Sequence, residues 1–251
     1  MEKRVPLEIS GERLVFRSER RLRRRNLFWG GRFGRGAKPP SELTISRFQG
    51  IVFDFGGVLW DMRWDVAREL DRAHGLPRSS LFETLYRCAA WRDVERGIGE
   101  PAAWREEAHR ALERLAGRPL PPLHEEWHKA QAAIQQNLAL VRALRPDYKL
   151  SILSNADVSL RHRLQHEIGI HDLFDDVVCS AEIGMAKPEP AVFHLAARRL
   201  GLSPAHCVFV DDWDQNIDAA RAVGMHAVLH RVDKGDDLRA QLEAAGITCR
   251  R

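Results

Sequence analysis

The chain has 251 residues, of which 44% are hydrophobic and 29% are charged, a balance typical of a globular protein with a sizeable core. Its longest apolar runs span only a few residues, so the sequence predicts no membrane-spanning helix, which needs about 20 apolar residues. The four cysteines are scattered, without disulfide or metal-ligand spacing, which favours a reduced cytoplasmic protein over a secreted one.

The positive charge of the chain is concentrated in its first 48 residues. They contain 13 Lys or Arg and 5 Glu, a net charge of +8, whereas the remainder contains 26 basic and 30 acidic residues, a net charge of −4. An Arg-rich run is followed by the Gly-rich segment GGRFGRGAKPP, with no sustained apolar period. We expect residues 1–48 to form a basic, disordered extension. Nucleic acid is an expected partner only through this extension, and the alternative is a tail without a function of its own.

Strand and helix signals alternate from residue 49 onward. The run IVFDF predicts a first strand, and KLSILSN, DVVCS, CVFVDD and AVLH predict four more. Helices are expected between and after these later strands, over 157–168, 189–200, 214–223 and 236–245. This alternation indicates an α/β fold with a doubly wound parallel sheet. We assign 49–61 and 146–251 to this core and 62–145 to a small inserted α-helical cap.

Polar residues follow several of the predicted strands, where ligands bind in open parallel sheets. The set contains an isolated carboxylate, a hydroxyl, an amide, an ammonium group and a pair of adjacent carboxylates. Together these groups suit phosphoryl transfer assisted by a divalent cation. In chain order they are Asp54, Ser154, Asn155, Lys187, Asp211 and Asp212.

Each residue type has a physical reason to be there. The carboxylate of Asp54 can attack phosphorus and form an aspartyl-phosphate that water then hydrolyses. Asp211 and Asp212 are like charges at one strand end, which is costly unless a cation such as Mg²⁺ lies between them. Ser154 can donate a hydrogen bond to a phosphoryl oxygen, and Lys187 can pair with both the phosphate and the nucleophile. Taken singly, Ser154–Asn155 and Asp211–Asp212 also suit helix N-caps, and Asp54 could be a polar residue at a strand end.

Four segments of the chain resemble the ordered motifs of the haloacid dehalogenase-like hydrolase superfamily. They are VFDFGGVL, ILSNAD, AKPEP and FVDDWDQNIDAARAVGM, and the resemblance covers about residues 50–247. The cap segment WRDVERGIG and the DD-x-x-x-N form resemble a subgroup that includes α-glucose-1-phosphate phosphatases and the phosphatase domain of soluble epoxide hydrolases. The resemblance implies a Rossmann-like core, a C1-type helical cap and Mg²⁺ as the cofactor.

The same resemblance implies roles for individual residues. Asp54 would be the nucleophile, with Ser154 and Lys187 as the other catalytic residues. The implied phosphate-binding residues are Gly56, Gly57, Ser154, Asn155 and Lys187. The implied metal-site residues are Asp54, Gly56 through its backbone carbonyl, Asp211 and Asp212.

One position departs from the pattern common in these phosphatases. Many of them carry a second Asp two residues after the nucleophile as the general acid and base, and this chain has Gly56 there. A glycine cannot transfer a proton, and general acid–base catalysis is worth about 10²–10⁴-fold. We therefore expect slow turnover or a replacement acid, for which Asp61 is one candidate.

The predicted function is hydrolysis of a small phosphorylated metabolite by a monomer or homodimer without membrane association. One alternative is a catalytically weak or inactive phosphate-binding module that carries a basic nucleic-acid-binding tail. A 2-haloacid dehalogenase is a further alternative, but such enzymes need no metal, and the pair Asp211–Asp212 argues against that chemistry. Several tryptophans of the cap lie at helical spacing, which favours the cap core for most of them and the substrate pocket for some.

Overall fold

The structure, a computed structural model, describes residues 47–249. Its centre is a five-stranded parallel sheet with the strand order β5-β4-β1-β6-β7. The strands are β1 (Gly50–Phe53), β4 (Lys149–Ser154), β5 (Asp176–Cys179), β6 (Cys207–Asp211) and β7 (His226–Leu229). The predicted α/β parallel sheet is therefore confirmed. The basic extension predicted over 1–48 lies, up to residue 46, outside the described residues.

The central strand β1 shows why these segments form a parallel sheet. It pairs with β4 on one side and with β6 on the other, so Gly50 lies opposite both Lys149 and Cys207. All four of its residues are buried. A strand that is covered on both faces carries a continuous apolar run instead of alternating polar and apolar residues.

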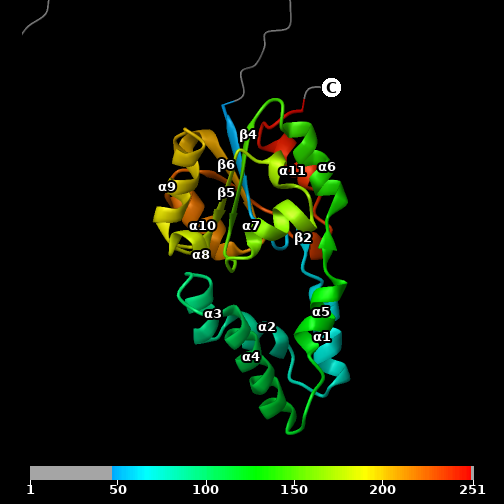
Figure 1. Cartoon of the computed structure of the whole chain (residues 1–251). Helices are drawn as coiled ribbons and strands as arrows, with labels where there is room; N and C mark the ends of the chain where they lie inside the picture. Colours follow the sequence, from blue (N-terminus) through cyan, green and yellow to red (C-terminus); the bar gives the residue numbers. More distant parts are fainter. Residues whose placement is uncertain (1–46, 250–251) are drawn as a thin grey trace, which may run out of the picture. The chain divides into compact units, whose positions relative to one another are not determined.

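Helices cover both faces of the sheet, and Figure 1 shows the α9 and α10 side opposite the α6 and α11 side. The first face packs the helices α9 (Pro190–Arg199) and α10 (Asp214–Ala222) through an apolar cluster that includes Phe193 and Ile217. The other face is covered by α6 (Gln135–Leu144), the short α7 (Leu160–His162) and α11 (Leu238–Ala244). Smaller elements of the core are α8 (Ser180–Ile183) and helical turns at His171–Leu173, Pro204–His206 and Val232–Lys234.

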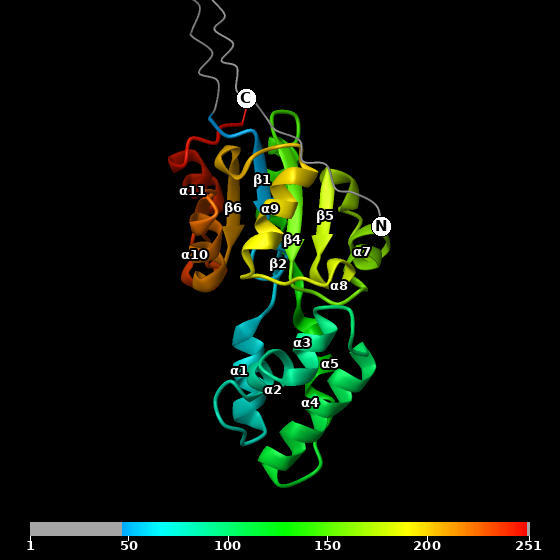
Figure 2. The same ribbon diagram turned by 90° about the vertical axis from the view of Figure 1, so that its left-hand side faces the viewer.

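The inserted segment between β1 and β4 forms a separate helical group (Figure 2). Its helices are α1 (Trp64–Ala73), α2 (Ser80–Tyr86), α3 (Ala89–Val94), α4 (Pro101–Ala116) and α5 (Leu123–Ala130). They bury an apolar cluster of their own, which includes Leu81, Trp104, Leu112 and Trp127. The group therefore has its own core, and we call it the cap.

A two-stranded antiparallel ribbon connects the cap to the sheet. It pairs β2 (Trp60–Asp61) with β3 (Ala132–Ala133). After β3 the chain enters α6, whose Leu138, Val141 and Leu144 belong to the apolar cluster of the sheet. We therefore place the end of the cap at this ribbon instead of at residue 145, because α6 packs on the sheet.

The expected helix over 157–168 also differs in detail. The backbone N–H of Ser159 donates to the Asp157 side chain (2.8 Å), and the helix begins only at Leu160. From Arg163 to Glu167 the chain then forms a π-helical turn, a feature that is often found at functional sites. Within residues 47–249, none of the helices is long and apolar enough to cross a membrane.

Candidate active site

The carboxyl ends of β1, β4 and β6 bring the predicted polar residues together. Phe53 lies opposite Ile152 of β4 and Val210 of β6, and the N–H of Asp54 donates to the Val210 carbonyl (2.8 Å). Continued by one residue, this register places Asp54 level with Asp211 of β6 and one residue before Ser154 of β4. The neighbouring strands thus place side chains that lie about a hundred residues or more apart in sequence at one edge of the sheet.

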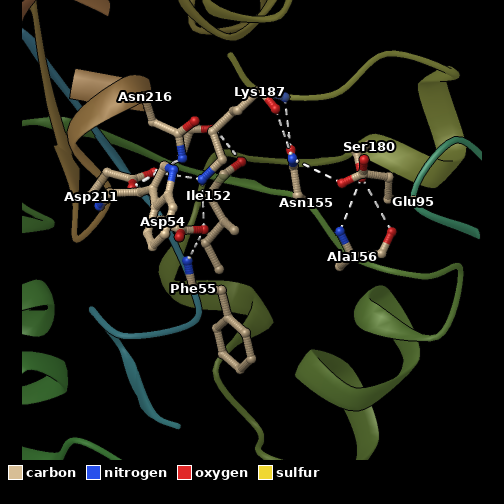
Figure 3. A network of polar contacts seen from close by, with 12 residues as sticks. Asp54, Phe55, Glu95, Ile152, Asn155, Ala156, Ser180, Lys187, Asp211 and Asn216 are labelled. Carbon is tan, nitrogen blue, oxygen red and sulfur yellow. Dashed lines mark hydrogen bonds and ion pairs between the residues drawn. The ribbon is translucent and has the colours of Figure 1, made fainter. Parts of the chain in front are cut away.

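Lys187 is the centre of the site. Its Nζ lies 2.8 Å from Oδ1 of Asp54 and 2.7 Å from Oδ2 of Asp211, and its side chain is only 1% exposed. Burial alone would lower the pKa of Lys187, but the charges of Asp211 and Asp54 outweigh it and raise the pKa. The lysine is therefore held as a cation between two carboxylates (Figure 3).

Asp211 faces away from solvent and is fully occupied by protein groups. Besides Lys187, the Nδ2 of Asn216 lies 3.1 Å from both of its carboxylate oxygens, and the N–H of Trp213 donates to Oδ1 (2.8 Å). Its side chain is 0% exposed. A buried carboxylate is stable when it has this many donors, so Asp211 fixes the position of Lys187.

Asn155 holds the backbone of the Lys187 loop. Its Oδ1 accepts from the N–H of Lys187 (2.8 Å), and its Nδ2 donates to the Lys187 carbonyl (2.9 Å). The same Nδ2 lies 3.1 Å from Oε2 of Glu95 in the cap. The side chain that the sequence places among the phosphate ligands is thus engaged with the protein, and it connects the lysine loop to the cap (Figure 3).

Asp212 is the third carboxylate at this edge. One oxygen each of Asp54, Asp211 and Asp212 can be chosen so that all three lie within 4.8 Å of one another, the only such cluster of possible metal ligands in the described part of the chain. Burial, followed by the charges of Asp54 and Asp211, raises the pKa of Asp212 to about 8. Burial is also the largest cause that raises the pKa of Asp54 to about 6, against the opposing charge of Lys187. This crowded negative charge and oxygen donor set fit a hard divalent cation.

The glycines that follow Asp54 leave room around these carboxylates. A Cβ on Gly57 would lie 2.2 Å from Oδ2 of Asp212, and the residue has φ +80°. Gly56 lines the same cavity as Asp54 and Ser154, and a Cβ there would lie 3.3 Å from Sδ of Met62. The Ser154 hydroxyl makes no hydrogen bond to any residue that the structure describes, so it is available to a ligand.

A cavity of about 370 Å³ lies above this edge, and its upper wall comes from the cap. The cap contributes Tyr86, Trp91, Glu95 and two arginines. One of them, Arg87, has its guanidinium 5.4 Å from the ring centroid of Phe82 and 4.9 Å from that of Trp213, which belongs to the core. The other, Arg92, follows Trp91 on α3. Phe82 and Trp213 line the cavity too.

Further contacts dock the cap on the core beside this cavity. Arg96 Nη2 lies 2.5 Å from Oε1 of Glu189, and its Nη1 donates to the Gly184 carbonyl (3.4 Å). At Gly97, with φ +74°, a Cβ would lie 2.2 Å from the carbonyl oxygen of Ala181. The ERG segment of the cap, Glu95 to Gly97, is thus a second place where the cap contacts the core, besides Arg87 and Trp213.

One residue that sequence reasoning considered lies elsewhere, and others were missed. Asp61 lines a neighbouring cavity with Asp212 and accepts from the N–H of Arg63 (2.8 Å), away from the cavity that contains Asp54. Glu95 and Arg87 were not predicted. Glu95 lies within WRDVERGIG, the cap segment that carries part of the resemblance, whereas the only sequence signal of Arg87 was a charge in an amphipathic cap, which many surface residues share.

Comparison with known proteins agrees with this geometry. A family model described as haloacid dehalogenase-like hydrolase matches residues 48–224. The chain is 30% identical to Phosphatase MT3486 of Mycobacterium tuberculosis over 205 residues, which cover 75% of this chain and 89% of that protein. It is 26% identical to the fructose-1-phosphate phosphatase YqaB of Escherichia coli, covering 72% of this chain and 96% of that protein.

A solved structure shares the fold. The wild-type HAD family enzyme bt-2542 of Bacteroides thetaiotaomicron, in complex with magnesium and inorganic phosphate, matches with a TM-score of 0.58. The match covers 77% of this chain and 98% of that one, at 21% identity.

Proposed function

This chain belongs to the haloacid dehalogenase-like hydrolases, and from that premise we propose that it is a Mg²⁺-dependent phosphatase of a small organic phosphate, with Asp54 as the nucleophile. The observation that carries the proposal is the contact of Lys187 with both Asp54 and Asp211, next to a third carboxylate and an unpaired serine hydroxyl. The two curated relatives described above are both named as phosphatases.

The hydrogen bonds of Asp54 indicate which of its atoms attacks. Its Oδ1 accepts from Lys187 Nζ (2.8 Å) and from the N–H of Phe55 (2.7 Å). Its Oδ2 has no hydrogen-bond partner within residues 47–249. We assign the attack on phosphorus to Oδ2, which forms an aspartyl-phosphate and expels the alcohol; water then hydrolyses that acyl phosphate.

The attack of an anion on an anionic phosphate requires positive charge. Lys187 supplies one fixed cation, and the Ser154 hydroxyl would donate to a phosphoryl oxygen. Asp54, Asp212 and the Gly56 carbonyl would hold Mg²⁺. Asp211 would add negative charge from its buried position beside Lys187. When bound, the cation supplies electrostatic stabilisation of the phosphoryl oxygens.

Glu95 is our candidate for the proton transfer that Gly56 cannot perform. Asp54, Asp212 and Glu95 are the carboxylates that line the catalytic cavity, and Glu95 alone lies outside the metal-site trio. Burial is the main cause that raises its pKa, against the opposing charge of Arg96 and the hydrogen bond from Asn155. It would protonate the leaving oxygen and then accept a proton from the attacking water.

The test is phosphate release from a panel of sugar and other organic phosphates, with Mg²⁺ and with a chelator. We expect metal-dependent release that is lost in Asp54→Asn and retained in Asp172→Asn, a fully exposed aspartate used as a matched control. Release of halide from 2-haloacids without a metal would instead favour a dehalogenase. Absence of turnover above the Asp54→Asn background would favour a binding module without catalysis.

Location and assembly are part of the proposal as well. Cys88, Cys179, Cys207 and Cys249 are all free thiols, which supports a reducing compartment such as the cytoplasm. We propose a monomer or homodimer that acts on a soluble metabolite.

A further inference from the structure

A second cavity, of about 440 Å³, adjoins the catalytic one. Met62 and Tyr86 line both cavities, and Phe55, the residue after the nucleophile, lines the second. Each volume lies within the range of about 300–1,000 Å³ that is typical of small-molecule sites. A phosphate group with a small alcohol needs only the first, so the second is available to a longer leaving group.

We propose that the second cavity binds the far end of the substrate, and that this end consists of an aromatic ring bearing an anionic group such as a carboxylate. This inference rests on the proposed phosphatase function, and it specifies the class of substrate. Two independent observations support it: the aromatic rings that line the cavity and the basic residues around it.

Aromatic rings line the second cavity, and the protein fixes their orientation. The Nε1 groups of three tryptophans all donate to protein acceptors: Trp60 to Gln131 Oε1 (3.1 Å), Trp104 to the Leu85 carbonyl (2.7 Å) and Trp127 to the Met62 carbonyl (2.5 Å). With their polar atoms satisfied, these rings offer apolar surface to a ligand. Rigid aromatic surfaces favour a flat apolar body, because little side-chain entropy is lost on binding.

Further rings connect this wall to the catalytic centre. Phe55 stacks on Trp60 with ring centroids 5.7 Å apart and an interplanar angle of 21°. Tyr86 lies at the boundary of the two cavities, with its ring centroid 6.0 Å from that of Trp104. The aromatic surface therefore continues from the residue beside Asp54 into the cap.

The cavity is also rich in cations. Its basic lining residues are Arg105, His124, His128, Lys129 and Arg163, and its acidic ones are Glu125 and Asp157. The guanidinium of Arg163 lies 5.6 Å from the ring centroid of Trp60 and 5.8 Å from that of Phe55. It forms no salt bridge with any residue of the described chain, so an anionic ligand would be its counter-ion.

The histidines indicate that these cations are close to one another. Burial lowers the pKa of His128, and the charges of Arg163 and Arg105 lower it further, against the opposing charges of Glu167 and Asp157. Burial is likewise the main cause that lowers the pKa of His124, with Arg105 adding to it against the opposing charge of Glu125. Arg105, on α4 of the cap, and Arg163, in the π-helical turn of the core, thus approach these histidines from two sides. An anion between cap and core would relieve their repulsion.

The kinetic experiment compares two matched series of aryl phosphates. One series consists of para-carboxyalkylphenyl phosphates of increasing chain length, and the other of their uncharged para-alkyl isosteres. For at least one chain length, we expect kcat/KM of the wild type to be about tenfold or more higher for the carboxylate, as a charged hydrogen bond provides. In Arg163→Gln this ratio should fall to near one. In Arg142→Gln, an exposed arginine of α6, it should be unchanged.

A binding experiment tests the inference without catalysis. The phenol products of both series are titrated against the wild type and Arg163→Gln, and the intrinsic fluorescence of the tryptophans in the cavity reports occupancy. Tighter binding of the carboxylated phenol to the wild type, lost in Arg163→Gln, supports the site even if no phosphate is hydrolysed. Failure of the proposed phosphatase function would appear as no turnover of either series.

Two outcomes overturn the inference. One is an equal kcat/KM for charged and uncharged isosteres at every chain length, together with equal binding of their phenols. The other is a carboxylate preference that persists in Arg163→Gln. A matched aliphatic series tests the ring, and an aliphatic carboxylate that performs as well as its aryl counterpart would contradict the aromatic part of the proposal.

Discussion

The catalytic cavity has a floor from the core, with Asp54, Ser154, Lys187, Asp212 and the buried Asp211, and a roof from the cap, with Tyr86, Arg87, Trp91, Arg92 and Glu95. The charges of the floor and of the roof are held in different ways. In the floor, Lys187 and Asp211 satisfy each other's charge, and Asn155 and Asn216 hold them through hydrogen bonds of 2.8–3.1 Å. In the roof, Arg87 rests against aromatic rings and forms no salt bridge with any of the residues 47–249. The Lys187–Asp211 pair is thus satisfied by protein groups, whereas Arg87 in the roof is available to pair with an anionic ligand.

This difference separates two tasks. A preorganised floor stabilises the same phosphoryl group in every reaction, because fixed charges need no rearrangement when the transition state forms. A roof of rings and unpaired cations instead recognises the group attached to the phosphate. Changes in the floor should therefore lower kcat for all substrates, and changes in the roof should alter the ranking among them.

Removal of the Lys187 ammonium has the largest expected effect. Lys187→Met leaves Asp54 and Asp211 buried without their shared cation. Breaking a buried pair in this way costs about 3–5 kcal/mol of unfolding free energy, and loss of a fixed charge at the reacting group lowers kcat by about 10²–10³-fold. Urea denaturation and phosphate release measure the two effects.

Lys149→Met is the control for this change. Lys149 is an exposed lysine of β4 whose Nζ donates to the Leu200 carbonyl (2.7 Å). Its loss should cost only about 1 kcal/mol and leave kcat unchanged. Equal losses in both variants would mean that Lys187 acts only through stability.

Glu95→Gln tests the link between roof and floor. A lost general acid lowers kcat by about 10²-fold for alkyl phosphates, whose alcohols leave only when protonated. The loss should be small for para-nitrophenyl phosphate, because nitrophenolate leaves without a proton. Glu83→Gln, an exposed carboxylate of α2, is the matched control. A loss that is the same for both leaving groups would assign Glu95 to structure instead of proton transfer.

Gly57→Ala perturbs the metal site and also strains the backbone, because Gly57 has φ +80°. The added Cβ would lie 2.2 Å from Oδ2 of Asp212, so the carboxylate must move, and we expect the Mg²⁺ concentration for half-maximal activity to rise about tenfold or more, within the 10–100-fold range known for groups that support metal ligands. Gly75→Ala has the same backbone strain, with φ +71°, but no atom within 4 Å of its Cβ. It should destabilise the cap without changing the requirement for Mg²⁺.

The carboxylates of the floor predict how the metal-free protein responds to pH. The pKa of Asp54 is raised to about 6 and that of Asp212 to about 8, both from an ordinary value of 3.8. At a pH between the ordinary pKa of 3.8 and these raised values, the native state holds protons that the unfolded chain has already released. Their stabilisation is therefore complete below about pH 4 and is lost as the pH rises through about 8.

In chelator, we expect the melting temperature to fall by roughly 5 °C or more between about pH 5 and pH 8.5. Mg²⁺ should reduce this fall, because it stabilises the ionised carboxylates. Asp212→Asn should flatten the profile in chelator. A melting temperature of the wild-type protein that is flat over the same range, or one that rises, would contradict raised pKa values at this site.

The sequence predicted the floor better than the roof, for a physical reason. Parallel strands end at one edge of a sheet, so apolar runs that stop at Asp54, Ser154 and Asp211 already imply that these residues meet. The Lys187 position followed from its place after the third predicted strand. The sequence did not show whether Asp211 or Asp212 forms the ion pair with Lys187, because that depends on the side-chain directions of two adjacent aspartates.

Assignments that rest on tertiary contacts were out of reach of the sequence. The helix at 135–144 has an apolar face, but nothing local specifies whether that face packs on the cap or on the sheet. The hydrogen bonds from Asn155 to Lys187 and Glu95 join residues 32 and 60 positions away. The catalytic cavity has walls from cap and core at once, so its shape exists only once both have folded.

The smallest expected effect concerns the contact that holds the roof in place. Arg96 and Glu189 form a half-exposed pair, and pairs of this kind contribute only about 0–1 kcal/mol. Arg96→Gln should therefore barely change the melting temperature. Its effect should appear as a rise of KM of a few-fold with little change in kcat, because a less firmly docked cap weakens substrate binding before it affects the floor.

The matched control is Arg110→Gln, which breaks the exposed pair with Glu106 within α4. Both variants lose a surface ion pair, but only Arg96 joins cap to core. Steady-state kinetics that show a raised KM in Arg96→Gln alone would support selection by the roof. A fall of kcat with unchanged KM would mean that the docked cap takes part in the chemical step. Glu95, which is hydrogen-bonded to Asn155, would then belong functionally to the floor instead of the roof.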